Sequence, residues 1–281
     1  MTNSDRNQAA DDAALTSSLY WDEQWRAIRL PYLVNPNTYW WSTFIRLFER
    51  SLADRPRTVL EVGCGACEWL IYFERRYAAR SFGVDYSSVG CQVGARNLEL
   101  AGCAGRLVRG DVRALPFAPA SFDLVFSLGV VEHFEQYAEL IRAMAALVRP
   151  GGCLLTTVPN FGGWIGVARR HQDPATSSMH LKIREPNLQT AYDHAGLVDV
   201  EIGHFGSFRI PYQPVPPIRG LGSGIRAVPV AAGRLLDKAL VAGYRVTGRS
   251  IESEWLSSGL YALGRRPDSR SDDGALPSRL S

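Results

Sequence analysis

Two closely spaced glycines, Gly63 and Gly65, follow an apolar run that begins at Thr58. Glycines at this spacing let the backbone turn sharply and approach a ligand without a Cβ atom in the way. A dinucleotide-binding turn needs a third small residue at position 68, where Glu68 would repel a pyrophosphate at the helix N-terminus. The pattern therefore predicts a nucleotide-type ligand other than NAD or FAD.

Acidic residues end the next two apolar runs. Asp85 lies about 20 residues beyond Gly65, and Asp111 ends the run that begins at Arg106. An acidic side chain at the carboxyl end of a strand can accept hydrogen bonds from ribose hydroxyls. Asp85 is therefore a predicted ribose-binding residue.

His133 is the candidate for proton transfer. It follows the fourth strand pattern, which spans residues 121–127, and ligands of open parallel sheets bind beyond the carboxyl ends of the strands. An imidazole with an ordinary pKa near 6.5 is mostly neutral at cellular pH and can accept a proton from a hydroxyl or amine. The sequence thus predicts His133 as a general base.

Strand and helix patterns alternate along the middle of the chain, which predicts an α/β fold with a parallel sheet. The helical pattern covers residues 135–148, and Arg149–Gly152 breaks the chain before an apolar strand at residues 153–158. A further strand pattern covers residues 258–265.

This order of segments resembles the class I S-adenosylmethionine-dependent methyltransferases. Their motifs are matched by Glu61–Gly65, Gly83–Asp85, Gly110–Asp111, Phe122–Val125 and Arg149–Gly152. The resemblance covers roughly residues 55 to 205 and the strand near the C-terminus. It implies a Rossmann-like, seven-stranded, mostly parallel sheet with an antiparallel last strand, an N-terminal aromatic cap and a helical insertion before that strand.

The resemblance also implies S-adenosylmethionine as the cofactor. This cofactor has no phosphate, which explains the absent third glycine. Glu61 is expected to face its amino-acid end, Asp85 its ribose and Asp111 its adenine amine. The full set of implied cofactor-binding residues is Glu61, Gly63, Gly65, Asp85, Tyr86, Asp111, Val112, Leu128, Tyr20 and Trp25.

His133 and His180 are the predicted catalytic residues. Together with Glu132 they look like the pattern of ubiquinone-type O-methyltransferases and small-RNA 2′-O-methyltransferases, which hold the acceptor oxygens with a divalent metal. Those enzymes have a further glutamate where this chain has Gly129. We therefore assign no metal ligands, and metal-assisted transfer is the alternative to a histidine base.

The predicted organisation is a disordered tail (1–18), an N-terminal cap (19–53), a cofactor-binding core (54–207), a helical insertion (208–250), the last strand (251–267) and a second disordered tail (268–281). The insertion is apolar with interspersed charges, which exclude a membrane span. It is expected to cover a hydrophobic pocket or to lie on a membrane surface.

The composition of the chain limits the classes of binding partner and the cellular location that we expect. The net charge is +3, and the arginine pairs are scattered along the chain, so nucleic acid is a disfavoured partner. The N-terminus has no apolar leader and the chain has five cysteines, an odd number, which favours a cytoplasmic protein with reduced thiols.

We expect methylation of a small hydrophobic acceptor, a specialised metabolite or a quinone-like ring, most simply on oxygen. The alternatives are C- or N-methylation of a small metabolite, methylation of RNA, and a non-enzymatic protein that binds the cofactor and a partner or membrane.

Overall fold

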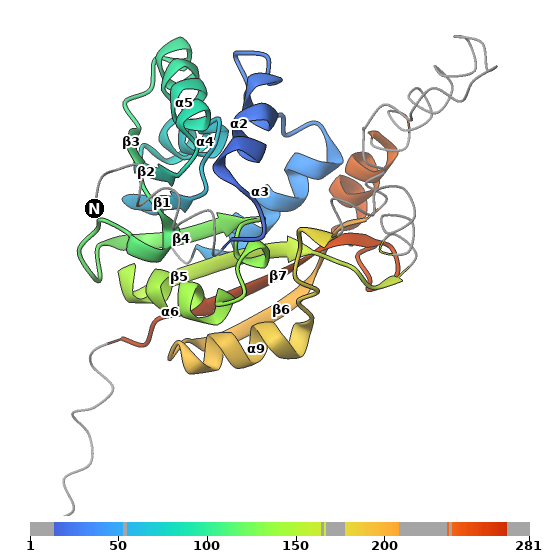
Figure 1. Cartoon of the computed structure of the whole chain (residues 1–281). Coiled ribbons are helices and arrows are strands. Elements are labelled where there is room, and N and C mark those ends of the chain that lie inside the picture. Colours follow the sequence, from blue (N-terminus) through green and yellow to red (C-terminus); the bar gives the residue numbers. More distant parts are fainter. Residues whose placement is uncertain are drawn as a thin grey trace, which may run out of the picture.

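A seven-stranded sheet lies at the centre of the protein (Figure 1). The computed structural model describes residues 14–52, 55–163, 166, 178–207, 235 and 238–268. The strand order is β3-β2-β1-β4-β5-β7-β6, and β7 runs antiparallel to both of its neighbours while the pairs from β3 to β5 are parallel. The predicted fold class is confirmed. The strands are β1 (Thr58–Val62), β2 (Arg80–Asp85), β3 (Arg106–Arg109), β4 (Phe122–Leu128), β5 (Val148–Pro159), β6 (Val198–Ser207) and β7 (Ser257–Arg265).

Helices cover both faces of the sheet. Successive side chains of a strand point to opposite faces, and in β4 Val125 packs in one apolar cluster while Leu124 and Phe126 pack in another. The first cluster holds α6 and α9, and the second holds α3 and α4. The helices are α2 (Ser18–Arg26), α3 (Tyr39–Ser51), α4 (Glu68–Tyr77), α5 (Ser88–Ala101), α6 (Tyr137–Leu147) and α9 (Glu185–His194), with short 3₁₀ turns η1 (Val112–Ala114) and η2 (Val131–His133).

The N-terminal cap is held by polar and aromatic contacts. The Asp22 carboxylate of α2 accepts hydrogen bonds from the Ser87 hydroxyl (2.5 Å) and the Val89 N–H (3.2 Å) at the start of α5. Residues 14–18, assigned to the tail from the sequence, contact the core, because the Leu15 N–H donates to the His133 carbonyl (2.8 Å). These contacts place α2 above the carboxyl ends of the central strands.

The segment Arg149–Gly152 differs from the expectation of a break before a strand. It lies inside β5, where the pairing with β4 jumps from Phe122↔Val148 to Leu124↔Cys153. Gly151 has φ +73°, a conformation that favours glycine, so the extra residues are accommodated as a bulge. The Pro-Gly-Gly residues of this segment therefore mark a bulge within β5 and not a break before it.

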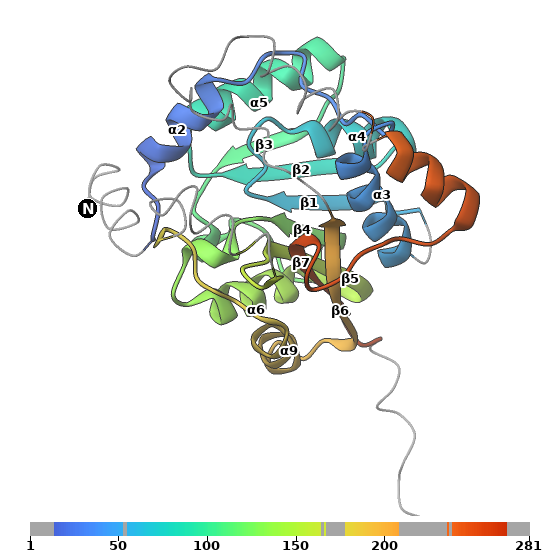
Figure 2. The ribbon, with the colours of Figure 1, turned by 90° about the vertical axis from the view of Figure 1, so that its right-hand side faces the viewer.

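Most of the predicted insertion, residues 208–234 and 236–237, and most of the two predicted tails lie outside the described residues. Residues 238–247 form a helix beside α3 (Figures 1 and 2), where the Arg46 guanidinium lies 4.1 Å from the ring centroid of Tyr244. Among the described residues, every helix is too short or too polar to cross a bilayer. The cytoplasmic location stays a prediction.

Candidate active site

A largely apolar cavity opens at the carboxyl ends of β1, β2 and β4. Among the predicted site residues, its lining includes Glu61, Gly63, Asp85, Tyr86, Asp111, Val112, Leu128, Trp25 and His133. Gly65, Tyr20 and His180 lie beside the cavity, outside this lining. The fold thus brings together residues from five separate segments of the chain.

The turn after β1 requires glycine at two positions. Gly63 has φ +79°, and a Cβ atom there would lie 2.4 Å from Cγ2 of Val130. Gly65 has φ +43°, and its Cβ would lie 2.1 Å from the indole ring of Trp25. The indole therefore packs directly on the backbone of the turn, which makes α2 a cover over this end of the cavity.

Asp85 joins the glycine turn to the end of β2. One carboxylate oxygen accepts the Gly65 N–H (2.8 Å) and the other accepts the Ser87 N–H (2.9 Å). Burial raises the pKa of Asp85, and these two hydrogen bonds act in the opposite direction. Each oxygen keeps a lone pair, so the carboxylate can accept further bonds from ligand hydroxyls.

Two glutamates at the same end of the cavity have unsatisfied oxygens. Oε2 of Glu61 and Oε2 of Glu68 are both shielded from solvent and have no hydrogen-bond partner among the described residues. Burial and the neighbouring Glu68 raise the pKa of Glu61 well above its usual range. Buried carboxylates without a donor are costly, so this end of the cavity fits a ligand that is cationic and donates hydrogen bonds.

Residues after β2, β3 and β4 also line the cavity. Asp111 already accepts from the Arg113 guanidinium (2.7 Å), and the Tyr86 hydroxyl donates to the Thr16 carbonyl (3.2 Å). Tyr20 contacts the ring of Trp21 edge-on, at 5.3 Å between centroids. The predicted contact of Asp111 with an adenine amine stays a prediction, and it would share the carboxylate with Arg113.

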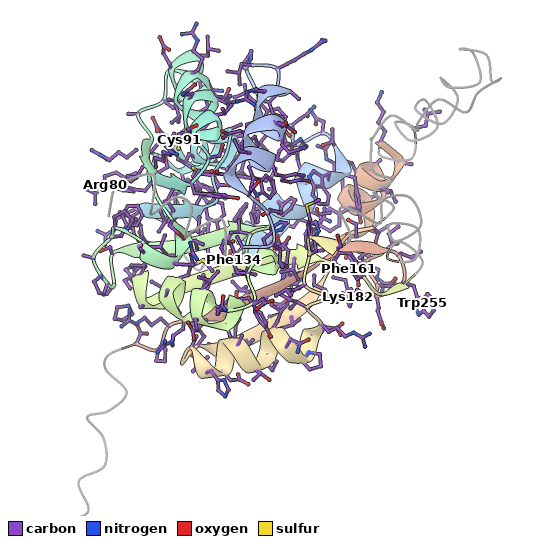
Figure 3. The ribbon with its side chains drawn as sticks, viewed as in Figure 1. Arg80, Cys91, Phe134, Phe161, Lys182 and Trp255 are labelled. Atoms are coloured by element: carbon purple, nitrogen blue, oxygen red, sulfur yellow. The ribbon has the colours of Figure 1, made fainter. Side chains whose placement is uncertain are left out.

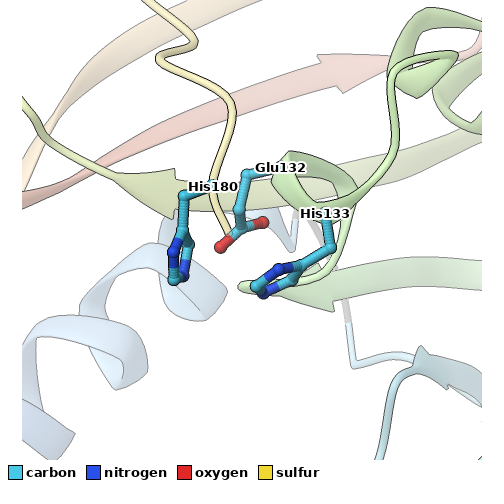
Figure 4. A group of neighbouring side chains, drawn as sticks. All are labelled: Glu132, His133 and His180. Carbon is cyan, nitrogen blue, oxygen red and sulfur yellow. The ribbon is translucent and has the colours of Figure 1, made fainter. Parts of the chain in front are cut away.

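Glu132, His133 and His180 point toward one another (Figure 4), with one ligand atom from each lying within 4.8 Å of the others, and His133 is the member of this group that lines the cavity. Nδ1 of His133 lies 2.9 Å from the Met179 carbonyl oxygen. Since a carbonyl can only accept, Nδ1 carries the proton, and Nε2 keeps its lone pair. Burial first, and then His180, lower the pKa of His133 to about 4, so its ring is neutral at physiological pH.

Residues 59–152 of this chain match the model of a protein family described as "Methyltransferase domain". These residues hold the glycine turn, both acidic strand ends and the bulge of β5. Residues 59–152 are a methyltransferase domain. The resemblance to S-adenosylmethionine-dependent enzymes is confirmed for this domain.

Relatives of this methyltransferase domain include demethylmenaquinone methyltransferase of Listeria welshimeri, 30% identical over 112 residues that cover 38% of this chain and 48% of that protein. A probable chloroplastic tocopherol O-methyltransferase of Oryza sativa is 28% identical over 155 residues, which cover 51% of this chain and 40% of that protein. The chain thus spans less than half the length of these two relatives.

Solved structures share the fold. Phosphoethanolamine N-methyltransferase 2 of Haemonchus contortus has a TM-score of 0.57 at 15% identity, covering 81% of this chain and 53% of that chain. Geranyl diphosphate C-methyltransferase of Streptomyces coelicolor has a TM-score of 0.54 at 14% identity, and the match covers 80% of this chain and 79% of that chain.

Several residues that line the cavity were not among the predicted site residues, and three of them are informative. Glu68 was interpreted only as a barrier to pyrophosphate, although its place directly after the glycine turn was a usable signal. Trp21 lies one helical turn before Trp25 and touches His133 edge-on, at 5.3 Å between centroids. Val130, which fills the space beside Gly63, gave no signal, because that contact joins separate loops.

Proposed function

We propose that this protein transfers the methyl group of S-adenosylmethionine to an oxygen of a small hydrophobic acceptor. The observation that carries the proposal is the unsatisfied, buried Glu61 carboxylate in the cavity beside Asp85 and the glycine turn. A cationic amino-acid group suits Glu61, and ribose hydroxyls suit the remaining lone pairs of Asp85.

In the proposed reaction, the residues around the cavity have different roles. The acceptor oxygen attacks the methyl carbon, the carbon–sulfur bond breaks, and its electron pair stays on sulfur. Nε2 of His133 accepts the hydroxyl proton. Holding the two reactants in line contributes roughly 7–11 kcal/mol to lowering the barrier, so the apolar walls matter as much as the base.

The acceptor side is aromatic and apolar. Trp21 and Leu128 line the cavity next to His133, and the ring of Phe161 lies 5.9 Å from that of His180. Such walls favour a flat, hydrophobic acceptor over a phosphorylated or charged one. The relatives named for demethylmenaquinone and tocopherol support a quinol-like ring.

A metal-assisted form of the same reaction is the second candidate, because Glu132, His133 and His180 converge. Two imidazoles and one carboxylate suit a metal such as Fe²⁺ or Zn²⁺ better than Mg²⁺, which prefers oxygen ligands. The Nδ1–H of His133, fixed by the Met179 carbonyl, would orient the ring for a metal as well as for a proton.

Contact with a membrane surface is proposed for the stretch from residue 235 to residue 255. Val246 and Trp255 are 84% and 68% exposed, and Leu235 is also exposed. Trp255 projects from the edge of the molecule (Figure 3). The exposed cationic side chains Lys238, Arg245 and Arg249 in the same stretch favour anionic lipid.

We expect the protein to sediment with vesicles that contain anionic phospholipid, and Trp255→Ala combined with Val246→Ser to reduce the bound fraction. Leu100→Ser, which removes an exposed apolar side chain on α5, is the matched control. Equal sedimentation of all three proteins with neutral and anionic vesicles would contradict the membrane proposal.

Cofactor binding tests the proposed function directly. Asp85→Ala should weaken S-adenosylmethionine roughly 10- to 100-fold in calorimetry, because a hydrogen bond to a charged group contributes about 1.5–3 kcal/mol. NADH should not bind to the wild-type protein. A folded Asp85→Ala variant with unchanged affinity would remove Asp85 from the site, and a mass increase of one methyl group on a quinol acceptor would establish the transfer.

A further inference from the structure

Among the described residues that line the cavity, Glu68 is the one carboxylate to which the methyltransferase motifs assign no role. It is the first residue of α4, directly after the glycine turn, and it lines the cavity with Glu61 and Asp85. Glu61 is 3% exposed, and Oε2 of each glutamate lacks a partner among the described residues. Two buried acceptor atoms therefore converge on one end of the cavity from two different elements.

The surroundings of the two glutamates are anionic or neutral. Asp85 and Cys67 act on Glu61 from the adjoining strand end and turn, Cys64 is buried beside them, and Asp22 of α2 acts on Asp85. The one arginine among the described lining residues, Arg113, is bound to Asp111. His133 is neutral. The described protein thus supplies no cation to balance these carboxylates.

We propose that Glu68 joins Glu61 in binding the ammonium group of the cofactor's amino-acid end, and that the empty site holds a proton which it releases when the ammonium arrives. This inference rests on the proposed function, because it assumes S-adenosylmethionine as the ligand. It makes Glu68 a determinant of specificity for a free α-amino group.

The electrostatics give the direction of the coupling. Burial raises the pKa of Glu68 to about 7, and burial and Glu68 together raise that of Glu61. Carboxylates so close in a dry site do not all ionise. A bound ammonium favours the ionised forms and lowers these pKa values, so the free protein carries more protons than the complex. Affinity should consequently rise with pH through about 7.

Calorimetry with S-adenosylhomocysteine, which has the same amino-acid end but no methyl group to transfer, tests the inference. Titrations at pH 6.5 in buffers of different ionisation enthalpy should show release of up to about one proton by the wild-type protein. Glu68→Gln should release fewer protons, bind about tenfold more weakly and lose most of the pH dependence. Glu139→Gln, in the first turn of α6 and outside the cavity lining, is the matched control.

A second experiment varies the ligand, and its first comparison uses only the wild-type protein. An analogue of S-adenosylhomocysteine without the α-amino group should bind the wild-type protein at least tenfold more weakly and without proton release. In Glu68→Gln the two ligands should differ less. The loss of this difference is the signature of a direct contact.

The possible failures are distinguishable. If S-adenosylhomocysteine does not bind the wild-type protein, the proposed function is wrong. If it binds, but the wild-type protein releases no proton or does not distinguish the two ligands, the inference about Glu68 is overturned while the proposed function stands. If Glu68→Gln discriminates between the ligands as strongly as Glu139→Gln does, Glu61 alone binds the ammonium.

Discussion

Replacing His133 with alanine should lower kcat by about 10²- to 10⁴-fold at neutral pH, the usual contribution of a general base. The ring is neutral with its Nδ1–H held by the Met179 carbonyl, so Nε2 is the atom that can accept a proton. Since the pKa of His133 is lowered to about 4, protonation of this ring should not reduce the rate until the pH approaches that value. The measurement is kcat with a quinol acceptor from pH 4.5 to 8.

His194→Ala is the control, because His194 is exposed at the end of α9. EDTA separates the base from the metal. If His133 acts alone, the chelator should leave kcat unchanged. If activity instead vanishes with EDTA and returns with a divalent ion, and Glu132→Ala and His180→Ala are as damaging as His133→Ala, the metal form of the reaction is established. Full activity of His133→Ala with no effect of EDTA would refute both.

Replacing Phe48 with alanine should lower the free energy of unfolding by about 3–5 kcal/mol. Phe48 belongs to α3 and is completely buried, and its ring centroid lies 4.9 Å from those of Trp69, Phe73 and Phe126. The substitution removes apolar area and three edge-on aromatic contacts and leaves a cavity between the cap and the sheet.

Urea denaturation followed by circular dichroism measures this effect. Phe48→Leu should cost less, because it keeps much of the buried volume. Leu100→Ala, at an exposed position of α5, should stay within about 0.5 kcal/mol of wild type. A loss below 1 kcal/mol for Phe48→Ala would mean that α3 is not docked on the sheet.

The strands and the glycine turn were predictable from local sequence. The run from Thr58 to Val62 is apolar apart from Thr58 and Glu61, as expected for a strand covered on both faces. Gly63 adopts the positive φ that its place in the motif predicts. The motif order then placed Asp85 beside the turn, where its carboxylate accepts the Gly65 N–H.

Contacts between distant segments could not be obtained in this way. Trp25 packs on Gly65, and His180 lies 4.5 Å from His133 between ring centroids, although each pair is separated by about 40 residues or more of chain. Such meetings depend on how loops and helices pack, and no local period encodes that packing.

The electrostatics of the site belong to the tertiary structure as well. In the sequence, Glu68 is an acidic residue in the first turn of a helix, a place where acids are common because the helix dipole favours them. Only the fold sets it beside Glu61 in a cavity without a free cation among the described lining residues. Burial and like charge, which exist only in the folded chain, raise the pKa values of two ordinary glutamates and form the site that we propose for the ammonium group.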